Sequence, residues 1–132
     1  MPDEKTEVGS VRDWLRHARS DLALARMRKT KTVLHEHLSF HAQQAAEKAL
    51  KAVLVHHRIR FPRTHDLAYL MNLLPSGVSI PPALIELPLL TKYAVQQRYP
   101  GDVPPATLKH RRQAVLLAQN AVAWATHVTR SI

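Results

Sequence analysis

The sequence predicts an all-α fold, a four- to five-helix bundle built on a long antiparallel helix pair. Three stretches repeat apolar residues at intervals of three and four, and no stretch alternates apolar and polar residues long enough to be a strand. The 132 residues include only 3 Gly and 9 Pro and are 45% hydrophobic, which is enough to build a packed core. We expect residues 1–9 to be an N-terminal tail and residues 10–132 to form one helical domain.

The first two predicted helices form the long pair. Ser10 is a suitable N-cap for a helix whose apolar positions run from Val11 to Ala25. A second helix is expected from about Val33 to Val55, where frequent alanines favour helix and let another backbone approach closely. The short link between these helices predicts an antiparallel hairpin.

The middle of the chain predicts two shorter helices. Thr64 is a plausible N-cap for the first, which follows the interruption at Pro62. A Pro-punctuated segment over residues 80–88 comes next, followed by a helix that begins near Leu89 and ends near Arg98.

The last predicted helix has Pro104 and Pro105 in its first turn and continues to about Thr129. Its apolar surface is wider than the single stripe of an ordinary surface helix. The broad apolar faces of the second and last helices predict either the core of a monomer or partial burial in a homodimer.

The charge balance predicts an anionic partner. Against 19 Lys and Arg stand 10 Asp and Glu, giving a formal charge of +9. Such an excess in a small domain favours nucleic acid, nucleotides or an acidic protein. The chain has no Cys, which excludes disulfides, thiolate nucleophiles and iron–sulfur clusters.

Other patterns exclude several kinds of site and location. No run of apolar residues is long enough to span a membrane, and the N-terminus lacks the order of a secretory signal, so we expect a cytoplasmic protein without membrane contact. His35-Glu36-His37 has the wrong spacing for two metal ligands on one helical face, and there is no Gly-rich phosphate loop. We therefore expect no metal site and no cofactor.

Residues 56–65 form the densest polar cluster, which we call the basic loop (HHRIRFPRTH). Its guanidinium groups, on Arg58, Arg60 and Arg63, can hold phosphate oxygens in pairs. A histidine such as His65 can move protons near neutral pH. The cluster therefore predicts either metal-free RNA cleavage, with His65 as base and Arg58 or Arg60 stabilising the phosphorane, or simply a solvated loop.

Two further sets of residues are candidate contacts. Along one side of the second helix, spacings of three and four align His37, His41, Gln44, Lys48 and Lys51, either as a polar groove or as a solvated face. Near the end of a later helix, Arg98 and Tyr99 either complement the helix dipole or contact a phosphate or a partner. In the second interpretation the Tyr99 hydroxyl is a group that can bind or be modified.

Several of these residues carry a family resemblance. The stretch from Phe40 to Ala52 (FHAQQAAEKALKA), then Thr64-His65-Asp66-Leu67, then Arg98-Tyr99-Pro100, resemble the HEPN domain (higher eukaryotes and prokaryotes nucleotide-binding). The first helix is also similar, through Trp14-Leu15, Ala18 and Asp21-Leu22. The similarity extends from about residue 10 to residue 128. It implies an all-α bundle that is usually dimeric.

The resemblance implies two kinds of function. Small stand-alone HEPN proteins are commonly encoded beside a minimal nucleotidyltransferase and are thought to act with it, often as the toxin of a toxin–antitoxin pair. Some HEPN domains bind nucleotide or RNA without catalysis, and here the expected contacts are His65 and Asp66 with Arg98 and Tyr99. Many others are metal-independent endoribonucleases with a motif of Arg, four to six residues, and His.

The ribonuclease motif is met here at an unusual place. Arg60 precedes His65 by four intervening residues, and Arg58 precedes it by six. In ribonuclease members the motif generally lies later, before the last core helix. In that region Arg98 is followed by His110 only after eleven residues. We therefore expect a nucleotide- or RNA-binding module, with the endoribonuclease as the alternative and a structural partner of an acidic protein as a third interpretation.

Overall fold

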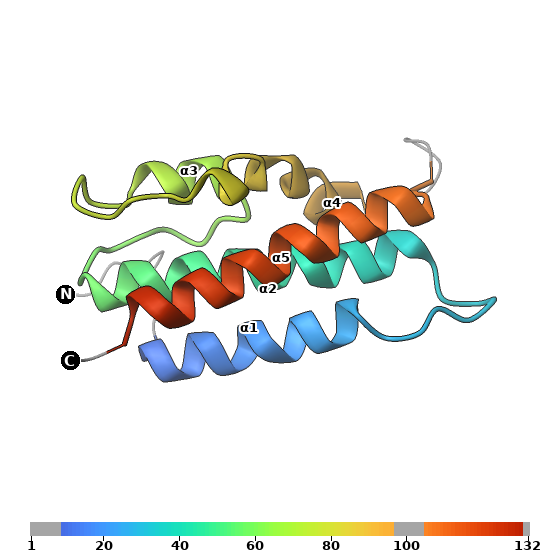
Figure 1. Ribbon diagram of the computed structural model, residues 1–132, viewed down its shortest axis with the longest axis horizontal. Helices are drawn as coiled ribbons and strands as arrows, with labels where there is room; N and C mark the ends of the chain where they lie inside the picture. Colours follow the sequence, from blue (N-terminus) through green and yellow to red (C-terminus); the bar gives the residue numbers. More distant parts are fainter. Residues whose placement is uncertain (1–8, 97–104, 131–132) are drawn as a thin grey trace.

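The computed structural model describes residues 9–96 and 105–130, and it confirms the all-α prediction. No β-strand occurs within these two ranges. The elements in chain order are α1 (Val11–Ala25), α2 (His35–His56), α3 (Leu67–Asn72), the 3-10 helices η1 (Pro82–Leu84) and η2 (Leu87–Leu90), α4 (Thr91–Gln96) and α5 (Leu108–Val128). Helices α1 and α2 form the predicted antiparallel pair (Figure 1).

Helix α1 begins as its sequence predicts. The Ser10 hydroxyl accepts a hydrogen bond from the Asp13 amide at 3.0 Å, and the Asp13 carboxylate accepts one from the Ser10 amide at 3.4 Å. This reciprocal capping box satisfies two amides that have no partner inside the helix. The hydrogen bonds with Ser10 are the main cause that lowers the pKa of Asp13.

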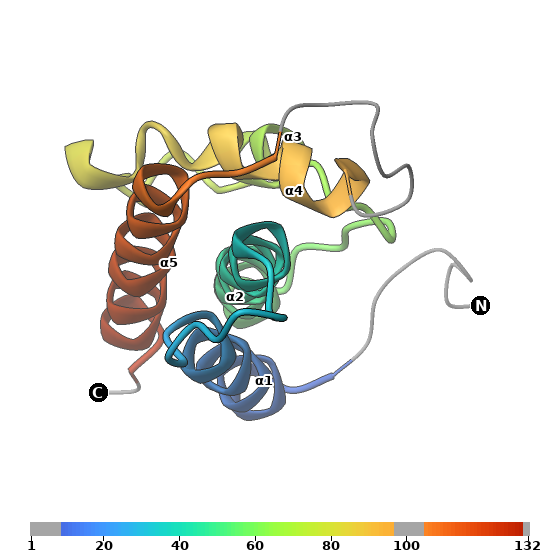
Figure 2. The same ribbon diagram turned by 90° about the vertical axis from the view of Figure 1, so that its right-hand side faces the viewer.

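Helix α2 is the centre of the molecule. Viewed end on, it lies between α1, α5 and the layer that contains α3 and α4 (Figure 2). Its alanines Ala42, Ala45, Ala46, Ala49 and Ala52 have no exposed surface. Small side chains on several sides of one helix let neighbouring elements approach its backbone closely, which explains the Ala-rich composition.

The segment between α2 and α5 differs from the prediction at its first cap. Asp66, not Thr64, is the N-cap of α3, and its carboxylate accepts from the Tyr69 amide at 3.2 Å. The Thr64 hydroxyl instead accepts from the Asp66 amide at 3.1 Å and shapes the turn before the cap. The next helix also starts later than expected, because η2 occupies Leu87–Leu90 and α4 begins at Thr91.

Helix α5 also begins later than predicted. Pro105 precedes the helix, and Pro104 lies outside the described residues. The helix starts at Leu108 because Thr107 and His110 form a capping box there, at 3.3 and 3.1 Å. Its buried residues Ala114, Leu117, Ala118, Ala121, Val122 and Ala125 belong to the monomer core. The homodimer remains a prediction.

The first turn of α2 predicts an acid sensitivity. The Nδ1 atom of His35 is buried and has no hydrogen-bond partner in the described part of the chain. Burial lowers the pKa of His35 below its ordinary value of 6.5, and the charges of Lys29 and Arg111 add to this effect. The unfolded chain therefore holds the His35 proton more tightly than the folded chain. As a result, protonation of His35 costs the protein stability as the pH falls below about 6.5, and this cost is absent above that pH.

We therefore expect His35→Gln to lose less thermal stability than the wild type between about pH 7.5 and pH 5. The measurement is the Tm of each protein at both pH values. His17→Gln, at an exposed position of α1, is the matched control and should follow the wild type. If His35→Gln and wild type lose the same number of degrees, the assignment to His35 is wrong.

Candidate functional site

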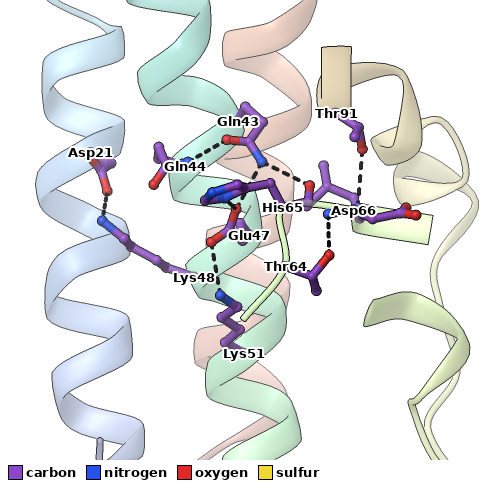
Figure 3. A network of polar contacts seen from close by, with 11 residues as sticks. Asp21, Gln43, Gln44, Glu47, Lys48, Lys51, Thr64, His65, Asp66 and Thr91 are labelled. Atoms are coloured by element: carbon purple, nitrogen blue, oxygen red, sulfur yellow. Dashed lines mark hydrogen bonds and ion pairs between the residues drawn. The ribbon is translucent and has the colours of Figure 1, made fainter. Parts of the chain in front are cut away.

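Glu47 is the buried centre of the polar network shown in Figure 3. Its side chain is 4% exposed and receives three groups. Lys51 approaches one carboxylate oxygen, Oε2, at 3.0 Å, while His65 Nδ1 lies 2.7 Å and Gln43 Nε2 lies 3.1 Å from Oε1. A buried carboxylate is tolerated when it is paired and hydrogen-bonded in this way.

Two glutamines hold the basic loop against α2. The Gln43 amide donates to Glu47 and also to the backbone carbonyl of His65 at 3.3 Å. Gln44 in turn donates to the Gln43 side-chain oxygen at 2.6 Å. Because one amide group contacts both the helix carboxylate and the loop backbone, the position of His65 is set by α2 rather than by the loop alone.

His65 combines a fixed orientation with an accessible ring. Its side chain is 55% exposed, although Nδ1 contacts the buried Glu47. An ionised carboxylate only accepts hydrogen bonds, so the ring proton lies on Nδ1. In the neutral ring Nε2 is then an acceptor, and in the protonated ring it is a second donor. This is the geometry in which a histidine can accept a proton or bind an anion.

Besides pairing with Glu47, Lys51 contacts the aromatic ring in the middle of the basic loop. Its ammonium group lies 5.5 Å from the centre of the Trp14 ring and 5.7 Å from the centre of the Phe61 ring. The two rings meet edge to face at 6.1 Å. A desolvated ammonium is attracted to aromatic faces. The contacts therefore fasten the buried Phe61, and with it the loop, to both long helices.

Asp21 on α1 holds the neighbouring side of α2. Lys48 Nζ lies 2.6 Å from its carboxylate, and His41 Nδ1 lies at 3.3 Å. Gln44 contacts Gln43, as described above. The predicted contacts His41, Gln44 and Lys48 therefore lie together along α2, and each has a partner within the protein.

The three loop arginines have a different environment. Arg58, Arg60 and Arg63 are exposed, and their side chains make no hydrogen bond or ion pair with any residue that the structure describes. Arg58 has φ 58°, a left-handed conformation that ends α2 in a Schellman motif, with its amide bonded to Val55 and the Ile59 amide bonded to Leu54. The guanidinium groups are thus available to an anion from solution.

The structure separates Arg58 from His65. Glu47 lies beside His65, and His57 precedes Arg58. The ten steps along the chain from Glu47 to His57 correspond to a rise of about 15 Å along α2. Phe61 lies against Lys51, one turn from Glu47, so Arg60 is closer to His65 along the returning loop. Asp66, the other predicted contact at this end, caps α3. Arg98 and Tyr99 lie outside the described residues.

Sequence reasoning did not identify Glu47 or Gln43 as site residues, although a signal was present. Gln43, Glu47 and Lys51 recur at intervals of four and therefore share one face of α2. Within 9–96 and 105–130, no group of three or more His, Asp or Glu is arranged to hold a metal ion. None of the described helices is both long and apolar enough to cross a membrane.

Glu47→Gln should lower the free energy of unfolding by about 3–5 kcal/mol, the usual effect of removing one member of a buried ion pair. Urea unfolding measures this change. Glu86→Gln, at an exposed position, is the matched control and should stay within about 0.5 kcal/mol of wild type. Equal stability of Glu47→Gln and wild type would show that the carboxylate does not hold the loop.

The chain has a family match and similar solved structures. The model of the HEPN domain matches residues 11–128. A crystal structure of TT1696 from Thermus thermophilus is similar with a TM-score of 0.77 and 31% identity, covering 89% of this chain and 96% of that one. The crystal structure of ST0689, described as an archaeal HEPN homologue, is similar with a TM-score of 0.72 and 25% identity. The match covers 93% of this chain and 100% of that one. No curated protein matches the chain. With a family model that covers its helices from α1 to α5, the chain belongs to the HEPN domain family.

Proposed function

We propose that this HEPN protein binds nucleotides or RNA through the basic loop and acts with a minimal nucleotidyltransferase in a toxin–antitoxin-like pair. The observation that supports binding is the exposed ring of His65, which the buried Glu47 orients beside a loop of arginines without partners among the described residues. A fixed imidazole in the same loop as accessible guanidinium groups is suited to phosphate oxygens.

The chemistry of the loop fits an anion better than a neutral ligand. A guanidinium group offers a planar pair of N–H donors that matches two phosphate oxygens. A protonated His65 adds one donor at Nε2, because Nδ1 already contacts Glu47. His41 and Lys48 are engaged with Asp21 and serve the fold, so the binding surface is expected to be the loop rather than this side of α2.

A second candidate function is metal-independent RNA cleavage. It is favoured by the Glu47–His65 contact, because a carboxylate that fixes the Nδ1 proton leaves Nε2 free to take the proton of a 2′-hydroxyl group. Arg60 would then stabilise the phosphorane, since Arg58 follows His57, which lies about 15 Å along α2 from Glu47, the partner of the ring. The separation of Arg58 from His65 is the reason that binding is the first proposal.

The binding proposal predicts the behaviour of Arg60→Ala/Arg63→Ala. Wild-type protein should bind a fluorescently labelled single-stranded RNA, and the double variant should bind it about tenfold more weakly. Removing two phosphate contacts should also make the dependence of log K on log salt less steep by about 1.4. Anisotropy titrations at several salt concentrations measure both effects, with the exposed pair Lys31→Ala/Lys92→Ala as the equal-charge control.

The same samples distinguish binding from cleavage. In the presence of a chelator, wild-type protein should leave the RNA intact over hours, and His65→Ala should bind it with only a modest loss. If wild type cuts the RNA and His65→Ala binds but does not cut, the endoribonuclease is the correct function.

The partner proposal predicts a small nucleotidyltransferase encoded next to this chain. Its tagged product, co-expressed with the untagged chain, should retain it on an affinity column at moderate ionic strength. A gene neighbourhood without such a reading frame, or complete loss of the chain on washing, would contradict the proposed pair.

A further inference from the structure

Helices α1 and α5 lie side by side at the outside of the molecule (Figure 2) and run antiparallel (Figure 1). Arg19 on α1 donates to the Thr126 hydroxyl on α5 at 3.2 Å, and at the other end Arg111 donates to the carbonyls of Ala25 and Met27 at 3.1 and 2.6 Å. The two helices are therefore joined toward both ends of their contact. We call the surface along which they meet, with one hollow toward each end, the groove between α1 and α5.

The first end of this groove is a hollow of about 400 Å³. Arginines and a histidine line it together with Val11, Leu15, Thr126 and Thr129. Arg12 and Arg19 come from α1, His56 from the end of α2, and Arg130 follows α5. All four residues are exposed. Convergence of three guanidinium groups and an imidazole on one hollow is typical of a site for a phosphate group.

The other end is a second hollow, of about 310 Å³. It is lined by Arg26, Arg111 and Arg112 together with Val115, Leu116 and Gln119. The carbonyl groups at the end of α1 hold Arg111 in place but do not neutralise its charge. Arg112 is exposed and extends the cationic surface away from these carbonyls.

Among the described residues, no carboxylate lines either hollow. Helix α5 contains no Asp or Glu over residues 108–128. The two acidic residues of α1 are engaged elsewhere, since Asp13 caps its own helix and the buried Asp21 faces Lys48. The groove therefore has an uncompensated positive charge, which attracts polyanions. A single acidic side chain would neutralise only a small part of this charge.

We propose that the groove between α1 and α5 binds the sugar-phosphate backbone of an RNA strand, with one phosphate seated in each hollow. From Arg12 to Arg26 the helix rises about 21 Å. Successive phosphates of a helical strand are spaced by roughly 3.4 Å along its axis, so this length spans about six of them. Ala23, near the end of α1, and Ala123, in the second half of α5, are exposed and have short side chains.

The groove and the basic loop form one path. His56 lines the first hollow and is also the first residue of the basic loop, so the two surfaces adjoin at this residue. The groove thus lengthens the surface of the proposed function, on which it rests for the identity of its ligand as RNA. It adds sequence-independent affinity, because its contacts are to phosphates and not to bases.

The test uses Arg112→Ala/Arg130→Ala, which removes one arginine from each hollow and leaves the helix contacts of Arg19 and Arg111 intact. We expect about tenfold weaker binding of a labelled 12-nucleotide oligouridine and a salt dependence less steep by about 1.4. The Lys31→Ala/Lys92→Ala control removes the same charge elsewhere and should bind like wild type. Thermal unfolding of each variant checks that the loss of Arg130, near the end of α5, has not unfolded the domain.

Comparison with Arg60→Ala/Arg63→Ala separates the two proposals. If the loop variant loses affinity and the folded groove variant binds like wild type, the groove inference is wrong and the proposed function stands. If the groove variant loses affinity and the loop variant does not, the groove is supported and the loop is not the binding site. If wild type binds no oligouridine at any salt concentration, both are overturned.

Discussion

The burial of Glu47 in the central helix is the constraint on which the arrangement of this molecule depends. Neighbouring elements pack on several sides of α2, so a charged group at the Glu47 position has no access to water and must find its partners inside the protein. Lys51 supplies the opposite charge, and Gln43 and His65 supply hydrogen bonds. The buried carboxylate is satisfied only when the loop containing His65 is folded back along α2.

This requirement links the core to the surface. The loop returns along α2 because His65 must reach Glu47 and Phe61 must cover Lys51 and Trp14. The remaining loop side chains, including Arg60 and Arg63, are thereby left in solvent. One set of contacts therefore stabilises the helix pair and also fixes the direction in which an exposed imidazole faces, which is what a binding or catalytic histidine needs.

Local signals predicted the fold where the chain makes its own contacts. Ser10 as an N-cap and the 3.6-residue period located α1, and the alanines located α2. The starts of α3 and α5 were predicted less well, because each has two neighbouring signals. Thr64 and Asp66 can both cap α3, and α5 could begin at the prolines or after Thr107. His65 was identified from its neighbours, whereas Glu47 resembled any charged residue of a helix. Its role comes from burial by α1 and the loop, which a pattern along one helix does not contain.

Charge is distributed between interior and surface by the same packing. Two of the few acidic residues, Asp21 and Glu47, are buried in ion pairs with Lys48 and Lys51, and these pairs are neutral to the outside. Each pair removes one negative and one positive charge from the surface. The excess of basic over acidic residues is therefore unchanged, and it lies on the residues that solvent can reach. Salt screens exposed charges over about 8–10 Å at physiological ionic strength, which is shorter than the groove between α1 and α5. A ligand that carries one charge responds only to one hollow, whereas a strand with many phosphates responds to the whole face.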